Sequence, residues 1–297
     1  MKSRNLAIVA LFLVQLLYGF NYTFAKTVMN EGYVKPFGFV LLRVAGATLL
    51  FWLMSLFLPN EKIDKKDFFQ LFLASVFGVF INMLLFLKGL EFTTPIHAST
   101  IMTITPIVIL ILSVFMLKER ITSLKILGVI IGFIGALILT LYGQSARAAD
   151  NILLGNLMIF LNAVSYSVYV ILIKKLTAKY HPFTFIKWLF LFGLILVTPF
   201  GFSEVQEIQW QSFTPYVTFS VIFVVVGATF GTYLLNPLAI SRLKASTVGI
   251  FIYLQPVIAG LFAILNGVDF VDAIKISAML LIFLGVYFVS KKPKTTN

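Results

Sequence analysis

The stretch ASTIMTITPIVILILSVFMLKE at residues 98–119 has a counterpart in ASTVGIFIYLQPVIAGLFAILNGVD at residues 245–269. Both begin with Ala-Ser, continue as an apolar run that contains one proline, and end at an acidic residue. Landmarks of the two halves stand 150 residues apart, namely Pro106 and Pro256, Glu119 and Asp269, and Gly135 and Gly285. The second half of the chain therefore repeats the first.

The composition is that of a membrane protein. Of the 297 residues, 60% are apolar and 11% are charged, whereas soluble domains average about 45–50% and 25%. A membrane-spanning helix needs about 20 apolar residues. Segments that meet this requirement cover residues 5–26, 36–58, 68–90, 95–117, 124–142, 152–173, 183–202, 213–237, 246–266 and 272–290. The connections between them leave no room for a soluble domain.

The ten predicted spans divide into two copies of five. The first repeat covers residues 1–142, a connecting loop covers 143–151, the second repeat covers 152–290, and a basic tail follows at 291–297. Because five is odd, consecutive copies must cross the membrane in opposite directions. Many secondary transporters have such inverted repeats, with the substrate near the midplane between them. We therefore expect an all-α membrane protein with ten transmembrane helices in two inverted five-helix repeats.

The distribution of positive charge predicts the orientation of these spans. The net charge is +12, and most of the 23 Lys and Arg residues lie on the side of the N-terminus. The positive-inside rule then predicts a multi-pass protein of the inner (plasma) membrane with both termini in the cytoplasm. The basic excess indicates topology and contact with anionic lipids, so nucleic acid is not an expected partner. Cysteine is absent, which excludes disulfides and thiolate metal sites.

Short motifs of the first half occur in the order Leu17-Tyr18-Gly19-Phe20-Asn21 with Lys26, then Arg43 with Ala45, then Ala98-Ser99 before Pro106 and Lys118-Glu119-Arg120. Those of the second half are Ala245-Ser246, Pro256 and Asp269. In this order they resemble the EamA-type permeases of the drug/metabolite transporter superfamily over nearly the whole chain. The resemblance implies ten helices around a central cavity, lined mainly by spans 1, 3, 4, 6, 8 and 9, and export or exchange of small metabolites. Asp269 departs from the pattern, because the repeat usually has Glu there.

Arg43 is the only charged residue near the middle of a predicted span. A charge at that depth costs about 2.5–3.5 kcal/mol on insertion scales, so it is a candidate for a function. Two interpretations remain open. Arg43 either binds a substrate carboxylate or gates the pathway, or it braces the bundle by bonding to carbonyl groups or snorkelling.

Acidic residues are absent from the predicted midplane. All 11 Asp and Glu residues fall at span ends or in loops, and both His97 and His181 lie near an interface. Proton relays are usually built from intramembrane Asp, Glu or His. The sequence therefore favours a facilitator or exchanger over a proton-coupled carrier. A membrane-embedded enzyme, which would need such groups, is not expected, and neither is a metal or a cofactor.

Uncharged polar side chains gather on single faces of several spans. Unpaired amides and hydroxyls are costly in lipid, and hydrogen bonds between membrane helices average only about 0.6 kcal/mol. These faces could serve packing, but together they favour a wet cavity for a zwitterionic, amphipathic or aromatic solute. With Arg43, the predicted substrate-binding residues are Tyr18, Asn21, Tyr22, Asn82, Thr103, Asn162, Tyr166, Tyr169, Thr232, Tyr233 and Tyr253.

Prolines and glycines predict special helix geometry. Pro106 and Pro256 each remove a backbone hydrogen bond and predict a kink. The freed carbonyls could contact substrate or hinge a gate, or the kink could be a fixed bend that shapes the bundle. The GxxxG patterns in spans 5 and 8 permit close approach of helices. We expect packing within a monomer, with a dimer face as the alternative.

These features together predict a secondary transporter. We expect an exporter or exchanger that moves a small organic metabolite, such as an amino acid, across the inner membrane by alternating access. A lipid flippase or scramblase and a multidrug efflux carrier are the alternatives. The expected partners are the solute and the membrane lipids.

Overall fold

The computed structural model describes residues 2–30, 32–58, 61–93, 95–141, 151–265 and 273–290, and every regular element within them is helical. Eight helical segments in this part are long and apolar enough to cross a membrane, and two shorter apolar helices accompany them. The predicted all-helical membrane fold is confirmed. Asp269, the tail at 291–297 and all of the predicted connecting loop except Asn151 lie outside the described residues.

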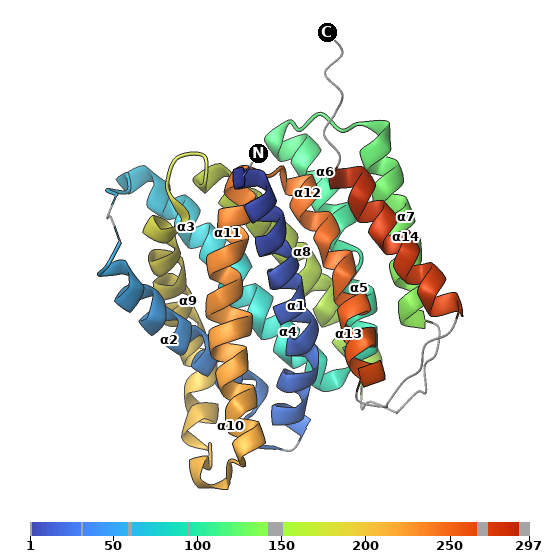
Figure 1. Ribbon diagram of the computed structural model, residues 1–297. Helices are drawn as coiled ribbons and strands as arrows, with labels where there is room; N and C mark the ends of the chain where they lie inside the picture. Colours follow the sequence, from blue (N-terminus) through green and yellow to red (C-terminus); the bar gives the residue numbers. More distant parts are fainter. Residues whose placement is uncertain are drawn as a thin grey trace.

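The helices pack as one upright bundle (Figure 1). Those of the first half are α1 (Lys2–Asn30), α2 (Pro36–Ser55), α3 (Phe68–Ser75), α4 (Ile81–Phe92), α5 (Pro95–Met102), α6 (Thr105–Leu117) and α7 (Ser123–Leu141). Those of the second half are α8 (Ile152–Leu176), α9 (Pro182–Gln206), α10 (Pro215–Ile222), α11 (Thr232–Arg242), α12 (Ala245–Ile250), α13 (Leu254–Leu265) and α14 (Ala273–Ser290). The start of α1 and the end of α14 lie at the same end of the bundle.

Corresponding segments of the two halves are interrupted at corresponding places. A π-helical turn, η2 (Val76–Phe80), joins α3 to α4, and a longer one, η4 (Phe223–Gly231), joins α10 to α11. The next segment of each half is also broken, between α5 and α6 in the first half, and by the 3-10 turn η5 (Phe251–Tyr253) between α12 and α13 in the second. Such π-turns are rare and often mark functional sites.

The two prolines form breaks between helices where kinks in continuous helices were predicted. Pro106 is the second residue of α6, and Pro256 is the third residue of α13. In the first turn of a helix the missing proline N–H would have no intrahelical partner in any case. Each proline therefore starts a new helix after the interruption that precedes it.

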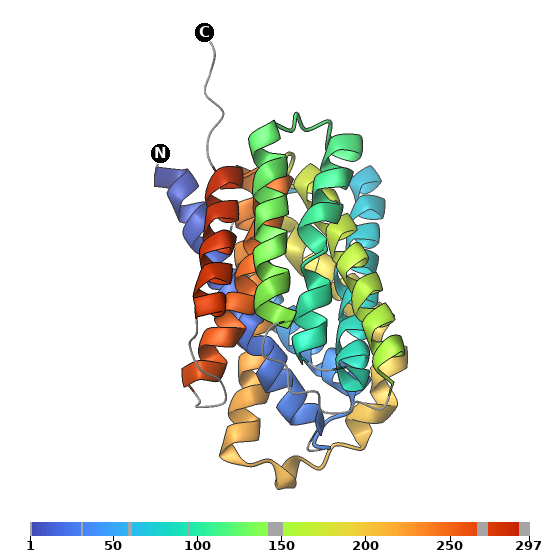
Figure 2. The ribbon, with the colours of Figure 1, turned by 90° about the vertical axis from the view of Figure 1, so that its right-hand side faces the viewer.

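The helices pair across the two halves. Helix α2 packs along α9, α7 along α14, α4 along α8, and α1 along α11. Figures 1 and 2 show α7 and α14 side by side at one edge of the bundle. Glycines permit this approach, since a Cβ atom added at Gly285 would lie 2.6 Å from the Gly128 carbonyl oxygen and 2.7 Å from the Gly132 nitrogen. The GxxxG pattern of α7 thus serves packing within the chain.

Two lysines at matching positions bind the ends of neighbouring helices. Lys26 on α1 donates to carbonyls at the end of α4, and Lys174 on α8 donates to carbonyls at the end of α11. The acceptors are Leu90, Glu91 and Thr93 for Lys26, and Ile240 and Leu243 for Lys174. A cation stabilises a helix C-terminus because the last carbonyls lack intrahelical partners.

Carboxylates link α2 and α9 reciprocally. Glu61, which follows α2, accepts hydrogen bonds of 2.9 Å from the His181 backbone N–H and the Thr184 hydroxyl at the start of α9. Glu204, near the end of α9, accepts one of 2.8 Å from the Gly38 N–H at the start of α2. The two bonds to Glu61 lower the pKa of its carboxyl, and the N–H of His181 contributes most. An anion at a helix N-terminus is stabilising.

We expect Glu204→Ala to lower the thermal stability of the purified protein, because it leaves the start of α2 uncapped at a cost of about 0.5–2 kcal/mol. Glu207→Ala is the matched control. Glu207 lies three residues further on and forms an ion pair with Lys35, in which both side chains are more than half exposed. Such pairs contribute about 0–1 kcal/mol. Equal melting temperatures for the two variants would contradict the capping role.

Candidate functional site

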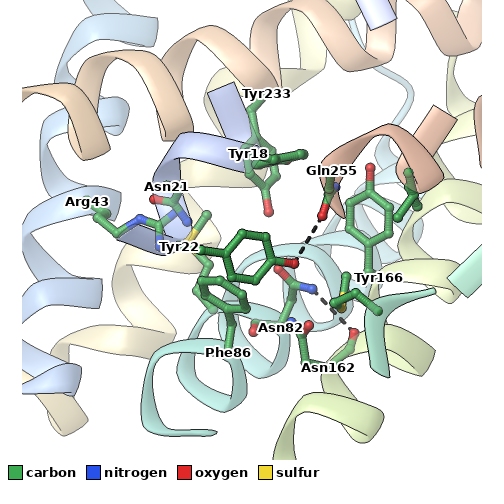
Figure 3. A pocket seen from close by; sticks show the side chains of 13 residues that line it. Tyr18, Asn21, Tyr22, Arg43, Asn82, Phe86, Asn162, Tyr166, Tyr233 and Gln255 are labelled. Carbon is green, nitrogen blue, oxygen red and sulfur yellow. Dashed lines mark hydrogen bonds between the residues drawn. The ribbon is translucent and has the colours of Figure 1, made fainter. Parts of the chain in front are cut away.

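A polar cavity lies inside the bundle between helices of both halves (Figure 3). It encloses about 520 Å³ of space free of protein atoms, counted to its open mouth. Its lining residues are Tyr18, Asn21 and Tyr22 from α1, Arg43 from α2, Asn82, Met83 and Phe86 from α4, Met102 from α5, Asn162 and Tyr166 from α8, Tyr233 from α11, Ile252 from η5, and Gln255 from α13.

Eight of the twelve predicted binding residues line this one cavity. Residues of the same helix reach the cavity together because positions three or four apart share a helix face. The eight are Tyr18, Asn21, Tyr22, Arg43, Asn82, Asn162, Tyr166 and Tyr233. The polar faces predicted on the first helix of each half thus point to the same space.

The predicted threonines do not line the cavity. Thr103 donates to the Thr100 carbonyl at 2.6 Å, and Thr232 donates to the Ala228 carbonyl at 2.8 Å. Both hydroxyl groups are buried and directed at their own backbone. Threonine in a helix commonly bonds to the preceding turn in this way. The polarity of a threonine is therefore weak evidence that it lines a cavity.

Two of the predicted tyrosines are also outside the lining. The ring of Tyr169 lies behind the cavity, with its centroid 5.8 Å from that of Tyr166 and 5.7 Å from that of Tyr233. Tyr253 packs against α7, where a Cβ atom added at Gly132 would approach its ring to 2.5 Å. Both tyrosines are fully buried, and they support the walls of the site.

Five lining residues were not predicted from the sequence, and four of them are apolar: Met83, Phe86, Met102, Ile252 and Gln255. In a chain with 60% apolar residues, an apolar side chain gives no signal that separates cavity, core and lipid. Gln255 could have been found, since an amide in an apolar span needs partners. Its Oε1 accepts from the Tyr22 hydroxyl at 3.0 Å and its Nε2 donates to Gln15 at 2.8 Å.

Arg43 combines a brace with an unpaired donor. Its Nε donates to the Thr229 hydroxyl at 2.9 Å, and only 3% of the residue is exposed. Its Nη1 has no hydrogen-bond partner among the described residues, and Arg43 lines the cavity together with Asn21 (Figure 3). Among the described residues that line the cavity, none is Asp or Glu. A buried charge without a partner is strongly unfavourable, so this group is prepared to receive an anion.

Two amide oxygens provide unpaired acceptors. Asn162 is held by its own amide nitrogen, which donates to the Asn82 carbonyl at 2.7 Å. Its Oδ1, like that of Asn21, has no hydrogen-bond partner within the described part of the chain. The cavity therefore offers one cationic donor and two neutral acceptors. Buried polar atoms of native proteins are nearly always paired, so these atoms point to a ligand with both acceptor and donor groups.

Aromatic rings form much of the remaining wall. The Tyr166 hydroxyl accepts from Asn236 at 2.6 Å, and the Tyr233 hydroxyl donates to the Gly78 carbonyl in η2. The Tyr22 ring packs edge-on against Phe86, with centroids 5.5 Å apart. Since these hydroxyls have partners in the protein, the rings present apolar surface to a ligand.

Curated relatives of this chain occur in bacteria, archaea and plants. The uncharacterized transporter YetK of Bacillus subtilis is 27% identical, over 76% of this chain and 68% of its own length. An uncharacterized transporter of Archaeoglobus fulgidus is 26% identical, over 96% of this chain and 98% of its own. The WAT1-related protein At4g30420 of Arabidopsis thaliana is 27% identical, over 78% of this chain and 71% of its own.

The fold and the family of the chain agree with these relatives. A solved crystal structure that is 19% identical superposes with a TM-score of 0.73, covering 96% of this chain and 97% of the other, and so shares the fold. The model of the EamA-like transporter family matches residues 5–141 and again residues 153–291. The chain, a multi-pass membrane protein, belongs to the EamA-like transporter family of the drug/metabolite transporter superfamily.

Proposed function

We propose that this chain is a secondary transporter, an exporter or exchanger that moves a small organic metabolite bearing a carboxylate, such as an amino acid, by alternating access. Ten transmembrane helices form two inverted repeats, over residues 1–142 and 152–290. Both termini lie in the cytoplasm and the protein resides in the plasma membrane. The working unit is a monomer.

Several pairs of features support the inverted repeats. The family matches twice, and the interruptions η2 and η4 recur in equivalent segments. Exchanging the halves converts the α4–α8 pair into the α11–α1 pair, and both are present. Lys26 and Lys174 hold equivalent helix ends. In such carriers one half rocks against the other around a central site.

The unpaired Nη1 of Arg43 inside this cavity carries the proposal for the solute. A carboxylate placed there would neutralise the buried guanidinium through charge-assisted hydrogen bonds. An ammonium group on the same solute would donate to the free oxygens of Asn21 and Asn162, and the tyrosine rings would enclose the rest. A purely cationic solute would meet Arg43 without a counter-charge.

Flux through proteoliposomes tests the function. Vesicles preloaded with an unlabelled amino-acid mixture would exchange labelled neutral amino acids, organic acids and organic amines from outside. We expect saturable exchange of solutes with a carboxylate and none of amines that lack one. Absence of saturable flux across the panel, or scrambling of labelled phospholipid in the same vesicles in its place, would overturn the proposal and favour a lipid flippase.

Asn162→Leu tests the acceptor side of the cavity. We expect weaker apparent affinity for a zwitterionic solute, by about tenfold, because one hydrogen bond to a charged group contributes about 1.5–3 kcal/mol. Ser167→Ala on the same helix is the control. Its hydroxyl bonds to the Ala163 carbonyl at 2.7 Å and does not line the cavity. Competition of exchange by the unlabelled solute measures both, and equal affinities would remove α8 from the pathway.

A further inference from the structure

A second hollow lies between the start of α1 and the end of α11, and none of its described lining residues belongs to the central cavity. It encloses about 560 Å³, counted to its open side. Its walls are Leu6, Ala7, Val9, Ala10, Leu13, Leu235, Leu238, Ala239 and Arg242. Alanines at its floor and larger apolar side chains at its edges form a groove along the two helices.

The groove is apolar and open to the surroundings of the bundle. Leu6, Val9 and Leu13 on its α1 edge are 63%, 54% and 44% exposed, whereas Ala7 and Ala239 are buried beneath them. In a chain that spans a membrane, these exposed side chains face lipid and not water. A hydrocarbon chain is the occupant that such a surface accepts without leaving polar groups unsatisfied.

One end of the groove is basic. Arg242, the last residue of α11, lines it and is exposed. Arg4, two residues before Leu6, donates to the Ser290 carbonyl nearby on α14, and Lys244 follows two residues after Arg242. Cationic side chains at the end of a spanning helix attract anionic headgroups. A guanidinium has five N–H donors, so Arg242 can add a phosphate to the contacts it already makes.

We propose that this groove binds one anionic phospholipid, with an acyl chain between α1 and α11 and the headgroup phosphate at Arg242. The charge of the groove selects the headgroup, and its apolar walls hold the chain. The position also connects lipid to transport, because α11 carries Tyr233 into the central cavity and presents its last carbonyls to Lys174. A lipid in the groove would therefore set the position of α11 against α1.

Lipid retention measures this site directly. The detergent-purified chain would be incubated with phosphatidylglycerol or phosphatidylcholine, and bound lipids counted by native mass spectrometry. We expect one phosphatidylglycerol to be retained preferentially. Arg242→Gln should lower its retention about fivefold, in line with one basic residue at an anionic headgroup. Ala10→Phe should displace the lipid by filling the groove, whatever its headgroup.

Two control variants separate the groove from the rest of the surface. Lys62→Gln removes an exposed cation elsewhere, and Ala273→Phe adds an aromatic ring at the exposed start of α14. Both should retain the lipid as the parent chain does. Equal retention of the two lipids by the parent chain, or of phosphatidylglycerol by all four variants, would overturn the site. If either Arg242→Gln or Ala10→Phe does not fold, lipid retention by the other variant tests the site. Lipid retention is measured without a transported solute, so its result does not depend on the result of the transport test.

Discussion

Arg43→Gln is expected to reduce the affinity for a carboxylate-bearing solute by about tenfold to a hundredfold. The substitution removes the charged donor from the cavity, and a hydrogen bond to a charged group contributes about 1.5–3 kcal/mol, with tenfold in affinity for every 1.4 kcal/mol. The folded protein should persist, because a neutral amide relieves the cost of a buried charge that has no counter-ion. Binding would be measured by the thermal shift that the solute produces, and by exchange in proteoliposomes.

The brace and the binding role of Arg43 can be separated. Thr229→Val removes the acceptor of the Arg43 Nε and leaves Nη1 free. If Arg43 binds solute, Thr229→Val should lower affinity only slightly while Arg43→Gln lowers it strongly. If Arg43 only braces α2 against η4, both variants should lose thermal stability, and affinity for the solute should be unchanged in the protein that remains folded.

Gly285→Ala is expected to destabilise the whole bundle. A Cβ atom there would lie 2.6 Å from the Gly128 carbonyl oxygen and 2.8 Å from the Gly132 Cα atom. These are backbone atoms, so α7 and α14 must separate. Overpacking typically lowers the free energy of unfolding by about 1–3 kcal/mol. We expect a loss at the upper end of this range because the two helices must separate along their length. Thermal unfolding of the purified protein in detergent would measure the loss.

Gly227→Ala provides the comparison within the chain. Its Cβ atom would approach only side chains, the nearest being Leu17 at 3.3 Å, and these can shift. We expect a melting temperature close to that of the parent chain. A similar loss in both variants would show that any added methyl group in an interior helix is harmful, and that the α7–α14 contact has no special role.

Much of the fold was predictable because lipid imposes strict rules on length and polarity. The apolar segments and the polar face with Tyr18 and Tyr22 follow from helical periodicity, and the structure places that face in the cavity. Met83 and Phe86 were not predictable, since an apolar side chain in a membrane helix suits lipid, core and cavity equally. The role of Pro106 was also beyond the sequence, because a proline can bend a helix or begin one.

The interactions inside the cavity depend on how the helices pack in three dimensions. Asn21 and Arg43 stand on different helices, and no sequence spacing shows that they line the same cavity (Figure 3). Thr103 and Thr232 were predicted to line the cavity because of their polarity, but a nearby carbonyl takes each hydroxyl. Which polar atoms remain unpaired depends on every neighbour, so it follows only from the packed structure.

Within the described part of the chain, the α7–α14 pair contributes no residue to the lining of the central cavity. The backbones of the two helices are in close contact at glycines, so the pair forms a rigid support beside the helices that line the cavity. Substitutions in the other helices can therefore change the solute preference while the α7–α14 pair holds the bundle together.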